Sequence, residues 1–261
     1  MTATARRRVA VVGSLAMVAL LAAPLLLLPH GYLAGPRHHR VREAPVAEAE
    51  LLRRLGPARY SQGYEELIVR DFFADAWRGT FVDVGAGHYR HHSTTYFLER
   101  HRSWRGLAVD ANADYAADYA RFRPRTTFVT AFVGDRDGGE ADFAVARNPL
   151  FSSGVLPLPA DAVTRRARVP RVTLDRLLAR SGVTRIDFLS IDVEGAEAAV
   201  LAAFDLRRYR PALVCVEVDK PGRARLFEHF RAAGYRELVA YRGLNEWNAF
   251  FTPGAGPGGR N

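Results

Sequence analysis

The pattern of apolar and polar positions along the chain predicts an α/β fold. Short continuous apolar runs that end at glycine or charged residues are typical of strands buried in a parallel sheet, and helical spacing dominates between them. The expected strands cover residues 81–84, 104–110, 128–133, 141–146, 186–195 and 212–218, and the range 186–195 includes the residues that leave its strand. The expected helices cover residues 60–76, 93–100, 113–122, 172–180, 196–204 and 227–233. Residues 235–241 and 248–252 are predicted to close the sheet as an antiparallel pair.

One stretch organises the rest of the chain, T-F-V-D-V-G-A-G at residues 80–87. Its apolar residues predict a buried strand, and Gly85 and Gly87 allow a sharp turn with room for a ligand beside the backbone. A helix can follow, with Ser93 as its N-cap. Strand, glycine turn and helix form the opening unit of nucleotide-binding α/β folds. The alternative is a tight turn that binds nothing.

The residues around this turn favour S-adenosylmethionine over a nicotinamide cofactor. A dinucleotide site expects a third glycine, and Arg90 stands in its place. Asp83 precedes the glycines, where its carboxylate can accept hydrogen bonds from an ammonium group. A nicotinamide-dependent oxidoreductase is therefore the less favoured enzyme class.

Two further acids follow predicted strands at positions suited to a nucleoside. Asp110 ends the second strand about 20 residues after the turn, where such folds place an acid that binds the ribose hydroxyls. The alternative is that Asp110 caps the helix at 113–122. Asp135 follows the third strand and is expected near the adenine.

A carboxylate cluster, Asp192, Glu194 and Glu197, follows the fourth strand. It can hold a divalent cation, supply a general base, or cap the next helix. We expect one member to cap, and we assign a functional role to Asp192 and Glu194 because they lie at the ligand-binding end of the sheet. Histidines 88, 91 and 92 lie in the loop after the glycine turn, and we hypothesise that His91 or Asp192 is the base.

Composition bounds the class of protein. The 261 residues are 48% hydrophobic, which suits one catalytic domain with a single core. The net charge is +9, but the basic residues are almost all arginine and are scattered, so we do not expect nucleic-acid binding. The only cysteine, Cys215, lies in an apolar run and excludes an intrachain disulfide.

The N-terminal segment predicts a membrane anchor. After a basic stretch at 1–8, residues 9–28 carry no charge and Pro29 closes the run, so a transmembrane helix is expected at 9–29. A cleaved signal peptide is the alternative. Arginines flank both sides, so we place the catalytic domain in the cytoplasm only because its cofactor is made there. A linker at 30–58, a catalytic domain at 59–252 and a flexible tail at 253–261 complete the chain.

Several motifs, in this order and spacing, resemble the FkbM family of S-adenosylmethionine-dependent methyltransferases. They are S-Q-G-Y-E-E-L-I-V-R-D-F-F (61–73), F-V-D-V-G-A-G (81–87), S-T-T-Y-F-L-E (93–99), W-R-G-L-A-V-D-A-N (104–112), and L-D-R-L-L followed by I-D-F-L-S-I-D-V-E-G-A-E (174–197). The resemblance implies a Rossmann-like class I methyltransferase fold, a mostly parallel sheet with helices on both faces and an antiparallel last strand. It implies transfer of a methyl group to a hydroxyl of a sugar, glycoconjugate or natural product.

The family pattern also implies roles for single residues. Asp83, Gly85 and Gly87 would line the methionine end of the cofactor, and Asp110 would hold the ribose. Asp192 and Glu194 would lie beside the transferred methyl group, with Asp192 touching the cofactor as well. The chain departs from the family where Gly87 replaces an asparagine and where Asp110 with Ala111 replaces Glu-Pro. The expected partner is a small-molecule or glycan acceptor, and no metal is assigned. The alternative is a catalytically silent, membrane-tethered binding protein with the same fold.

Overall fold

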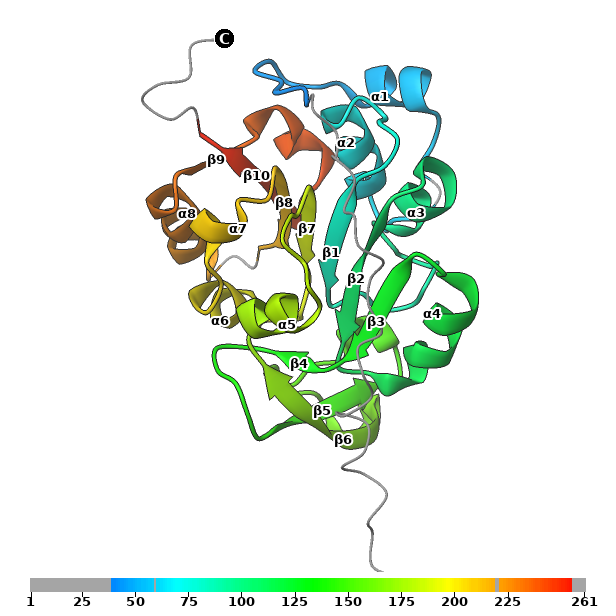
Figure 1. Ribbon diagram of the computed structural model, residues 1–261, viewed down its shortest axis with the longest axis vertical. Helices are drawn as coiled ribbons and strands as arrows, with labels where there is room; N and C mark the ends of the chain where they lie inside the picture. Colours follow the sequence, from blue (N-terminus) through cyan, green and yellow to red (C-terminus); the bar gives the residue numbers. More distant parts are fainter. Residues whose placement is uncertain (1–38, 59, 219–220, 255–261) are drawn as a thin grey trace, which may run out of the picture. The chain divides into compact units, whose positions relative to one another are not determined.

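A seven-stranded sheet forms the centre of the molecule (Figure 1). The computed structural model describes residues 39–58, 60–218 and 221–254. In spatial order the strands are β3 (Thr126–Thr130), β2 (Arg105–Asp110), β1 (Thr80–Val84), β7 (Phe188–Ile191), β8 (Leu213–Glu217), β10 (Asn248–Pro253) and β9 (Tyr235–Glu237). The strands from β3 to β8 are parallel, whereas β10 is antiparallel to both of its neighbours. The prediction of a mostly parallel, Rossmann-like sheet with an antiparallel closing pair is confirmed.

The central strands are covered on both faces. Every position of β1 and β7 is buried, although alternate side chains of a strand point to opposite faces. In Figure 1, α3 and α4 lie on one side of the strands, and α6 and α8 lie on the other. The α-helices are α1 (Glu48–Leu55), α2 (Glu65–Phe72), α3 (Tyr96–Arg102), α4 (Ala116–Phe122), α5 (Leu174–Arg180), α6 (Glu197–Ala202), α7 (Leu206–Tyr209) and α8 (Arg223–Ala232).

The predicted N-cap Ser93 is not the N-cap of α3, since that position is Thr95, which has no side-chain cap hydrogen bond. Thr173 caps α5, because its hydroxyl accepts from the Arg176 N–H. Helix α3 begins at Tyr96, later than predicted, yet Ser93 Oγ still accepts the Tyr96 N–H at 3.1 Å. The intervening Thr95 is fully buried.

A second sheet, with order β4-β6-β5, is inserted after β3. It consists of β4 (Phe132–Val133), β5 (Glu140–Ala146) and β6 (Val163–Val172). The single strand predicted at 128–133 is divided at Ala131, whose N–H donates to the Asp110 carbonyl at 3.0 Å. Strand β6 was not predicted, because its arginine-rich sequence V-T-R-R-A-R-V-P-R-V buries only Val169 and Val172 and lacks an apolar run.

Residues before the glycine-turn strand contribute to the core. Leu51 of α1 is fully buried in the cluster that also contains Phe72, Phe81 and Trp104. The Val46 N–H donates to the Ala240 carbonyl at 2.9 Å. Segment 46–55 is therefore packed against the sheet.

The prediction of a membrane anchor, and with it that of a membrane localisation, is wrong. Within residues 39–58, 60–218 and 221–254, no helix is long and apolar enough to cross a membrane. The segment at 9–29 on which that prediction depended lies outside the described residues.

Two tryptophans offer a matched test of the core. Trp104 is fully buried and donates from Nε1 to the Ala76 carbonyl at 3.0 Å, whereas Trp77 is 64% exposed. We expect Trp104→Ala to lower the free energy of unfolding by about 3–5 kcal/mol, since it leaves a large cavity. Trp77→Ala should change it by less than about 1 kcal/mol. Urea denaturation measures both, and similar losses for the two variants would contradict this account of the core.

Candidate active site

The glycine turn after β1 is in direct contact with the exit of β7. Gly85 has a φ of +80°, and a Cβ there would lie 1.6 Å from the Asp192 carbonyl oxygen. Backbone bonds hold this geometry: the Asp192 N–H donates to the Val84 carbonyl at 2.9 Å, and the Gly85 N–H donates to the Val109 carbonyl at 2.9 Å. Only glycine fits, because any side chain would overlap the neighbouring backbone.

Gly87 and Asp110 are hydrogen-bonded across the turn. The Gly87 N–H donates to Asp110 Oδ2 at 2.8 Å, and the Asn112 N–H donates to Oδ1 at 2.7 Å. Asn112, not Asp110, caps the following 3₁₀ turn (Ala113–Tyr115). Burial raises the pKa of Asp110 to about 6, although both backbone donors oppose the rise. No atom lies within 4 Å of where a Gly87 Cβ would be, so there is open space beside the turn.

The Asp83 carboxylate is hydrogen-bonded to a buried polar network. Its Oδ2 accepts from Thr95 Oγ1 at 2.7 Å, and Thr95 Oγ1 also accepts from the Arg123 guanidinium at 3.1 Å. Arg123 is almost fully buried, pairs with Glu99 and donates to the Tyr89 carbonyl at 2.9 Å. Burial raises the pKa of Asp83, while Thr95 and the Arg123 charge oppose it.

Sequence analysis missed this network. Arg123 lies between helix α4 and strand β3, in a polar stretch without a recognisable motif. It reaches Asp83 through Thr95 only in the folded chain. Glu99 is the residue that could have indicated this network. It is an acid on the buried face of α3, and a buried acid needs a partner.

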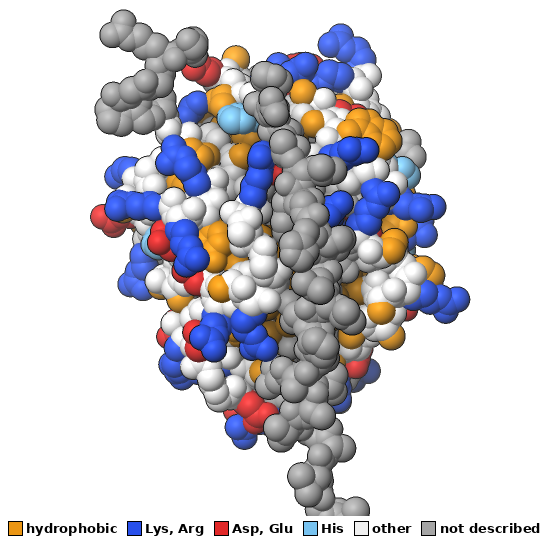
Figure 2. All heavy atoms as spheres, viewed as in Figure 1, with side chains coloured by type: hydrophobic (Ala, Val, Ile, Leu, Met, Phe, Trp, Pro, Cys, Tyr) orange, Lys and Arg blue, Asp and Glu red, His pale blue; other side chains and the backbone are white. Residues whose placement is uncertain are grey.

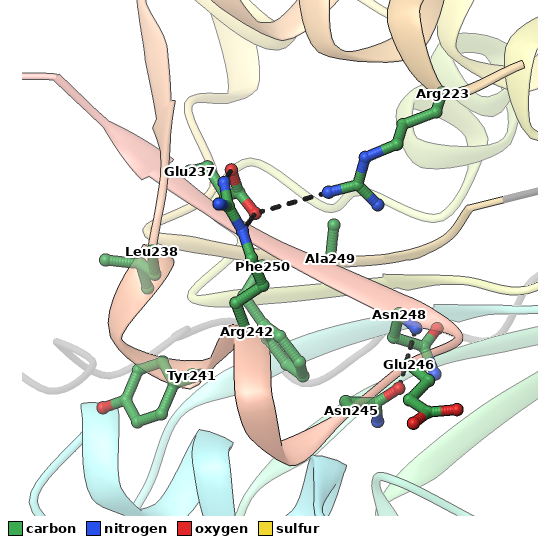
Figure 3. A pocket seen from close by; sticks show the side chains of 10 residues that line it. All are labelled: Arg223, Glu237, Leu238, Tyr241, Arg242, Asn245, Glu246, Asn248, Ala249 and Phe250. Atoms are coloured by element: carbon green, nitrogen blue, oxygen red, sulfur yellow. Dashed lines mark hydrogen bonds and ion pairs between the residues drawn. The ribbon is translucent and has the colours of Figure 1, made fainter. Parts of the chain in front are cut away.

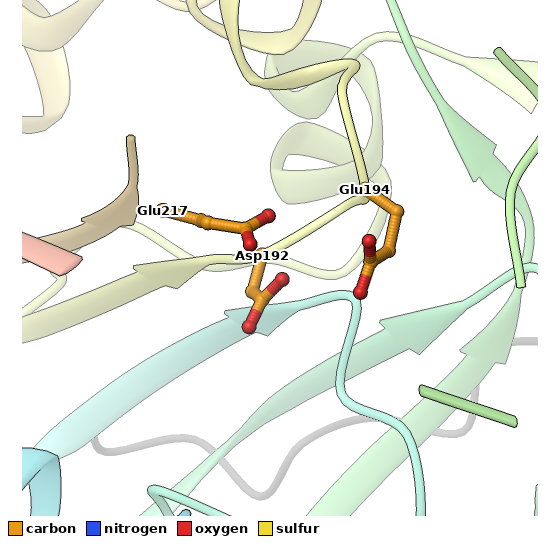
Figure 4. A group of neighbouring side chains, drawn as sticks. All are labelled: Asp192, Glu194 and Glu217. Atoms are coloured by element: carbon orange, nitrogen blue, oxygen red, sulfur yellow. The ribbon is translucent and has the colours of Figure 1, made fainter. Parts of the chain in front are cut away.

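Three carboxylates meet at the ends of β7 and β8 (Figure 4). Asp192, Glu194 and Glu217 each bring one oxygen within 4.8 Å of the others. Asp192 follows Ile191, which pairs with Val216, so the register places Asp192 beside Glu217. The sequence pattern indicated a functional role for Asp192 and Glu194, and the fold adds Glu217 to them. Such a trio can share protons among its members or bind a cation through oxygen ligands.

The surroundings raise the pKa of two members of this trio, Asp192 and Glu194. Desolvation by surrounding protein, then the charge of Glu217 and a hydrogen bond to it, raise the pKa of Asp192 well above its usual range, even though the side chain still reaches solvent. Burial, then the charges of Asp192 and Glu197, raise the pKa of Glu194 to about 7. A proton is therefore available within the cluster near neutral pH.

Helix α6 has no side-chain cap at its N-cap Ala196, so the capping role that we expected for one member of the cluster is not filled, and the loop before the helix is instead held by Glu197. Its Oε1 accepts the N–H groups of Val193 at 2.9 Å and Gly195 at 3.2 Å. This clamps a strained loop, because Glu194 has a φ of +53° and Gly195 one of +98°. Glu197 thereby fixes where the Glu194 side chain begins.

A loop from the second sheet contacts the same segment. Ser153 Oγ, from the F-S-S-G turn, donates to the Glu194 carbonyl at 3.0 Å and accepts the N–H of Leu156 at 2.9 Å. Leu156 lies against Gly195, where an added Cβ would meet its Cδ2 at 3.0 Å. Phe151, Val155 and Leu156 are exposed large apolar side chains on this loop.

The remaining predicted site residues lie in exposed loops. His91 is exposed, and its ring centroid is 4.7 Å from that of His88. His88 Nδ1 accepts the N–H groups of Arg90 and His91, which folds the loop back on itself. Asp135 is exposed after β4 and lies 3.7 Å from the Arg136 guanidinium. The roles given to His91 and Asp135 stay predictions.

The start of β10 completes this edge of the sheet. Asn248 pairs with Glu217 in the ladder, and its Nδ2 donates to Glu65 Oε1 at 3.1 Å. Behind these residues, Figure 3 shows a pocket lined by Asn245, Tyr241 and neighbouring residues. Its volume is about 20 Å³, which admits one water-sized group and excludes a nucleoside.

Comparisons with known proteins agree with this architecture. The sequence profile described as "Methyltransferase FkbM domain" matches residues 83–237, more than half of the 261 residues. No curated protein gave a match.

Two solved structures are also similar to the chain. The first is a TehB-like SAM-dependent methyltransferase from Corynebacterium glutamicum ATCC 13032, with 16% identity, a TM-score of 0.39, and coverage of 78% of this chain and 94% of that one. The second is the delta-N METTL16 MTase domain, with 13% identity, a TM-score of 0.37, and coverage of 71% and 78%.

The two glycines of the turn should respond differently to substitution. Gly85→Ala places a methyl group on the Asp192 carbonyl, so we expect a loss of at least about 3 kcal/mol of unfolding free energy or failure to fold. Gly87→Ala meets no atom and should cost only about 1–2 kcal/mol for its left-handed backbone. Urea denaturation compares them, and equal losses would contradict the close contact at Gly85.

Glu194 should make stability depend on pH. Its pKa rises from 4.5 to about 7 on folding, so the folded state binds the extra proton within that window. Wild-type stability relative to Glu194→Gln should therefore fall as pH rises from 4.5 to about 7 and level off above it. We expect a change on the order of 1–2 kcal/mol, reduced by solvent screening. Parallel urea denaturation of both proteins across this range measures it, and a constant difference would contradict the raised pKa.

Proposed function

The chain belongs to the FkbM methyltransferase family, and on this premise we propose that it binds S-adenosylmethionine and methylates a hydroxyl group. The observation that carries the proposal is the line of carboxylates along one edge of the sheet. Asp83, Asp110 and Asp192 lie at or just after the carboxyl ends of adjacent strands, and burial, with the Asp83 charge as a smaller cause, raises the pKa of Asp110 and Asp192. An edge this acidic favours a ligand with positive groups.

The residues fit the cofactor by charge and by space. S-adenosylmethionine carries an ammonium group and a sulfonium, and Asp83 with Asp192 supplies acceptors for positive charge. The open space at Gly87 leaves room for a ligand beside the turn. Asp110 presents a carboxylate beside it for ribose hydroxyls, and Asp135 is the residue we assign to the adenine end. When bound, the cofactor supplies a methyl group on a positively charged sulfur.

The protein's own contribution is alignment and proton transfer. An acceptor hydroxyl must lose its proton as it is methylated, and a base with a pKa near the working pH does this best. Glu194, with a pKa raised to about 7 and a strained, clamped backbone, meets this condition. Asp192 shares a hydrogen bond with Glu217 and can take a proton within the same cluster. His91 is the alternative base.

We assign acceptor binding to the loop that carries Phe151 and Leu156. It contacts the Glu194 segment through Ser153 and presents exposed apolar side chains. An acceptor with an apolar portion beside its hydroxyl, such as a glycoconjugate or natural product, fits this surface.

Calorimetric titration with S-adenosylmethionine and S-adenosylhomocysteine tests cofactor binding. We expect saturable binding of both to the wild type and at least about tenfold weaker binding to Asp83→Ala, since that variant removes one charged acceptor. Asp142→Ala, an exposed acid on β5, is the control and should bind like the wild type. A folded protein that binds neither compound would reject the methyltransferase proposal.

Proton release distinguishes the role of the acid cluster. The sulfonium of S-adenosylmethionine should lower the pKa of Glu194 and Asp192, so binding at pH 7 should release protons. S-adenosylhomocysteine has a neutral sulfur and should release fewer. Calorimetry in buffers with different ionisation enthalpies counts the protons. Equal release by the two ligands, or release unchanged in Glu194→Gln, would place the sulfonium away from this cluster.

A further inference from the structure

A second concave site lies at the opposite edge of the central sheet. It is a cavity of about 260 Å³ lined by Arg78, Gly79, Thr80, Ser103, Arg105 and Arg125. Thr80 and Arg105 begin β1 and β2, and Arg125 directly precedes β3. The acids of the candidate active site stand at the other ends of these parallel strands, so the two sites are separate.

The cavity carries three guanidinium groups without a carboxylate partner in the described part of the chain. Neither Arg78, Arg105 nor Arg125 forms an ion pair among residues 39–58, 60–218 and 221–254. Three like charges around one cavity repel each other unless an anion lies between them.

Two acids accept backbone N–H groups of residues that line the cavity, and both form ion pairs with other arginines. Asp187 accepts the Thr80 N–H at 2.8 Å and pairs with Arg185. Glu99 accepts the Arg125 N–H at 2.8 Å, but its ion pair is with Arg123. Neither Asp187 nor Glu99 therefore forms an ion pair with a guanidinium group of the cavity.

The backbone at this edge is strained. Arg78 has a φ of +64° and Ser103 one of +56°, and neither is glycine. The Arg78 N–H donates to the Arg102 carbonyl at 2.8 Å, which fixes the turn that carries the Arg78 side chain. Strained, well-held turns are frequent where side chains must be aimed at a ligand.

We propose that this cavity binds a small molecule through a phosphate or sulfate group. Guanidinium groups form paired hydrogen bonds with such oxyanions, and the Ser103 and Thr80 side chains can add hydroxyl donors. The volume suits an oxyanion group with a small remainder attached, and it is below that of most drug-sized pockets. On the face seen in Figure 2, arginine side chains are spread among other residue types, so a general positive charge is the effect to separate from this site.

Titration of the full-length protein with inorganic pyrophosphate and with sodium sulfate, at about 0.15 M ionic strength to screen long-range attraction, tests the proposal. The cavity variant is Arg78→Gln/Arg105→Gln/Arg125→Gln. The matched control is Arg121→Gln/Arg166→Gln/Arg231→Gln, which removes the same charge from exposed positions outside the cavity. We expect saturable binding by the wild type and the control, and at least about tenfold weaker binding by the cavity variant.

The result that overturns the proposal is equal weakening in both variants, which would mean general electrostatic attraction, or no saturable binding by the wild type. Thermal unfolding without ligand checks that both variants are folded. If the triple cavity variant is unfolded, Arg125→Gln alone, at an exposed position outside strand β3, replaces it with the same readout. Because the probes lack any methyl donor, the outcome is independent of the proposed methyltransferase activity.

Discussion

The contact between Gly85 and the Asp192 carbonyl is the constraint on which the candidate active site depends. It requires a residue without a side chain, in a left-handed conformation, at the point where β1 meets the exit of β7. This contact joins the glycine turn to the segment that carries Asp192 and Glu194, at the same end of the sheet. The hydrogen bonds from Gly87 to Asp110 and from Asp192 to Val84 extend it over three adjacent strands. The residues that we propose for cofactor and acceptor binding thereby lie close together along the sheet.

The second constraint is electrostatic. Burial raises the pKa of the carboxylates at the ends of neighbouring strands, the Asp83 charge adds to the rise at Asp110 and Asp192, and the fold tolerates this because each is anchored differently. Asp83 is anchored through Thr95 to buried Arg123, Asp110 by backbone N–H groups, and Asp192 by sharing a hydrogen bond with Glu217. Of these three acids, only Asp83 lies near a buried cation, the Arg123 guanidinium. The negative charge of Asp110 and Asp192 is therefore balanced by protons or by a bound cation. This dependence is the physical link between the arrangement of acids and a positively charged cofactor.

Local chemistry made some features predictable from the sequence. Buried apolar runs, the glycine turn and the order of the acids are each encoded within a few neighbouring residues. Strand β6 was not predictable in this way, because its arginines interrupt every apolar run and it is stabilised by pairing with β5 and β4. The positions of Arg123 and Glu217 were equally hidden, since their roles come from neighbours far away in the chain. Membrane attachment was inferred from hydropathy in a segment outside the described residues, and no helix of residues 39–58, 60–218 and 221–254 supports it.

The inserted second sheet carries the loop that we propose for acceptor binding, outside the central sheet. Its loop reaches the acid segment by one side-chain hydrogen bond, from Ser153 to the Glu194 carbonyl, and by the packing of Leu156 on Gly195. The loop is otherwise exposed, so its outer side chains can vary without disturbing the central sheet. A change at Phe151 would alter only what the loop contacts, whereas a change at Ser153 would also move the backbone that presents Glu194. Under the proposed roles, a change of acceptor and a change in the position of Glu194 are therefore separable at the first position and coupled at the second.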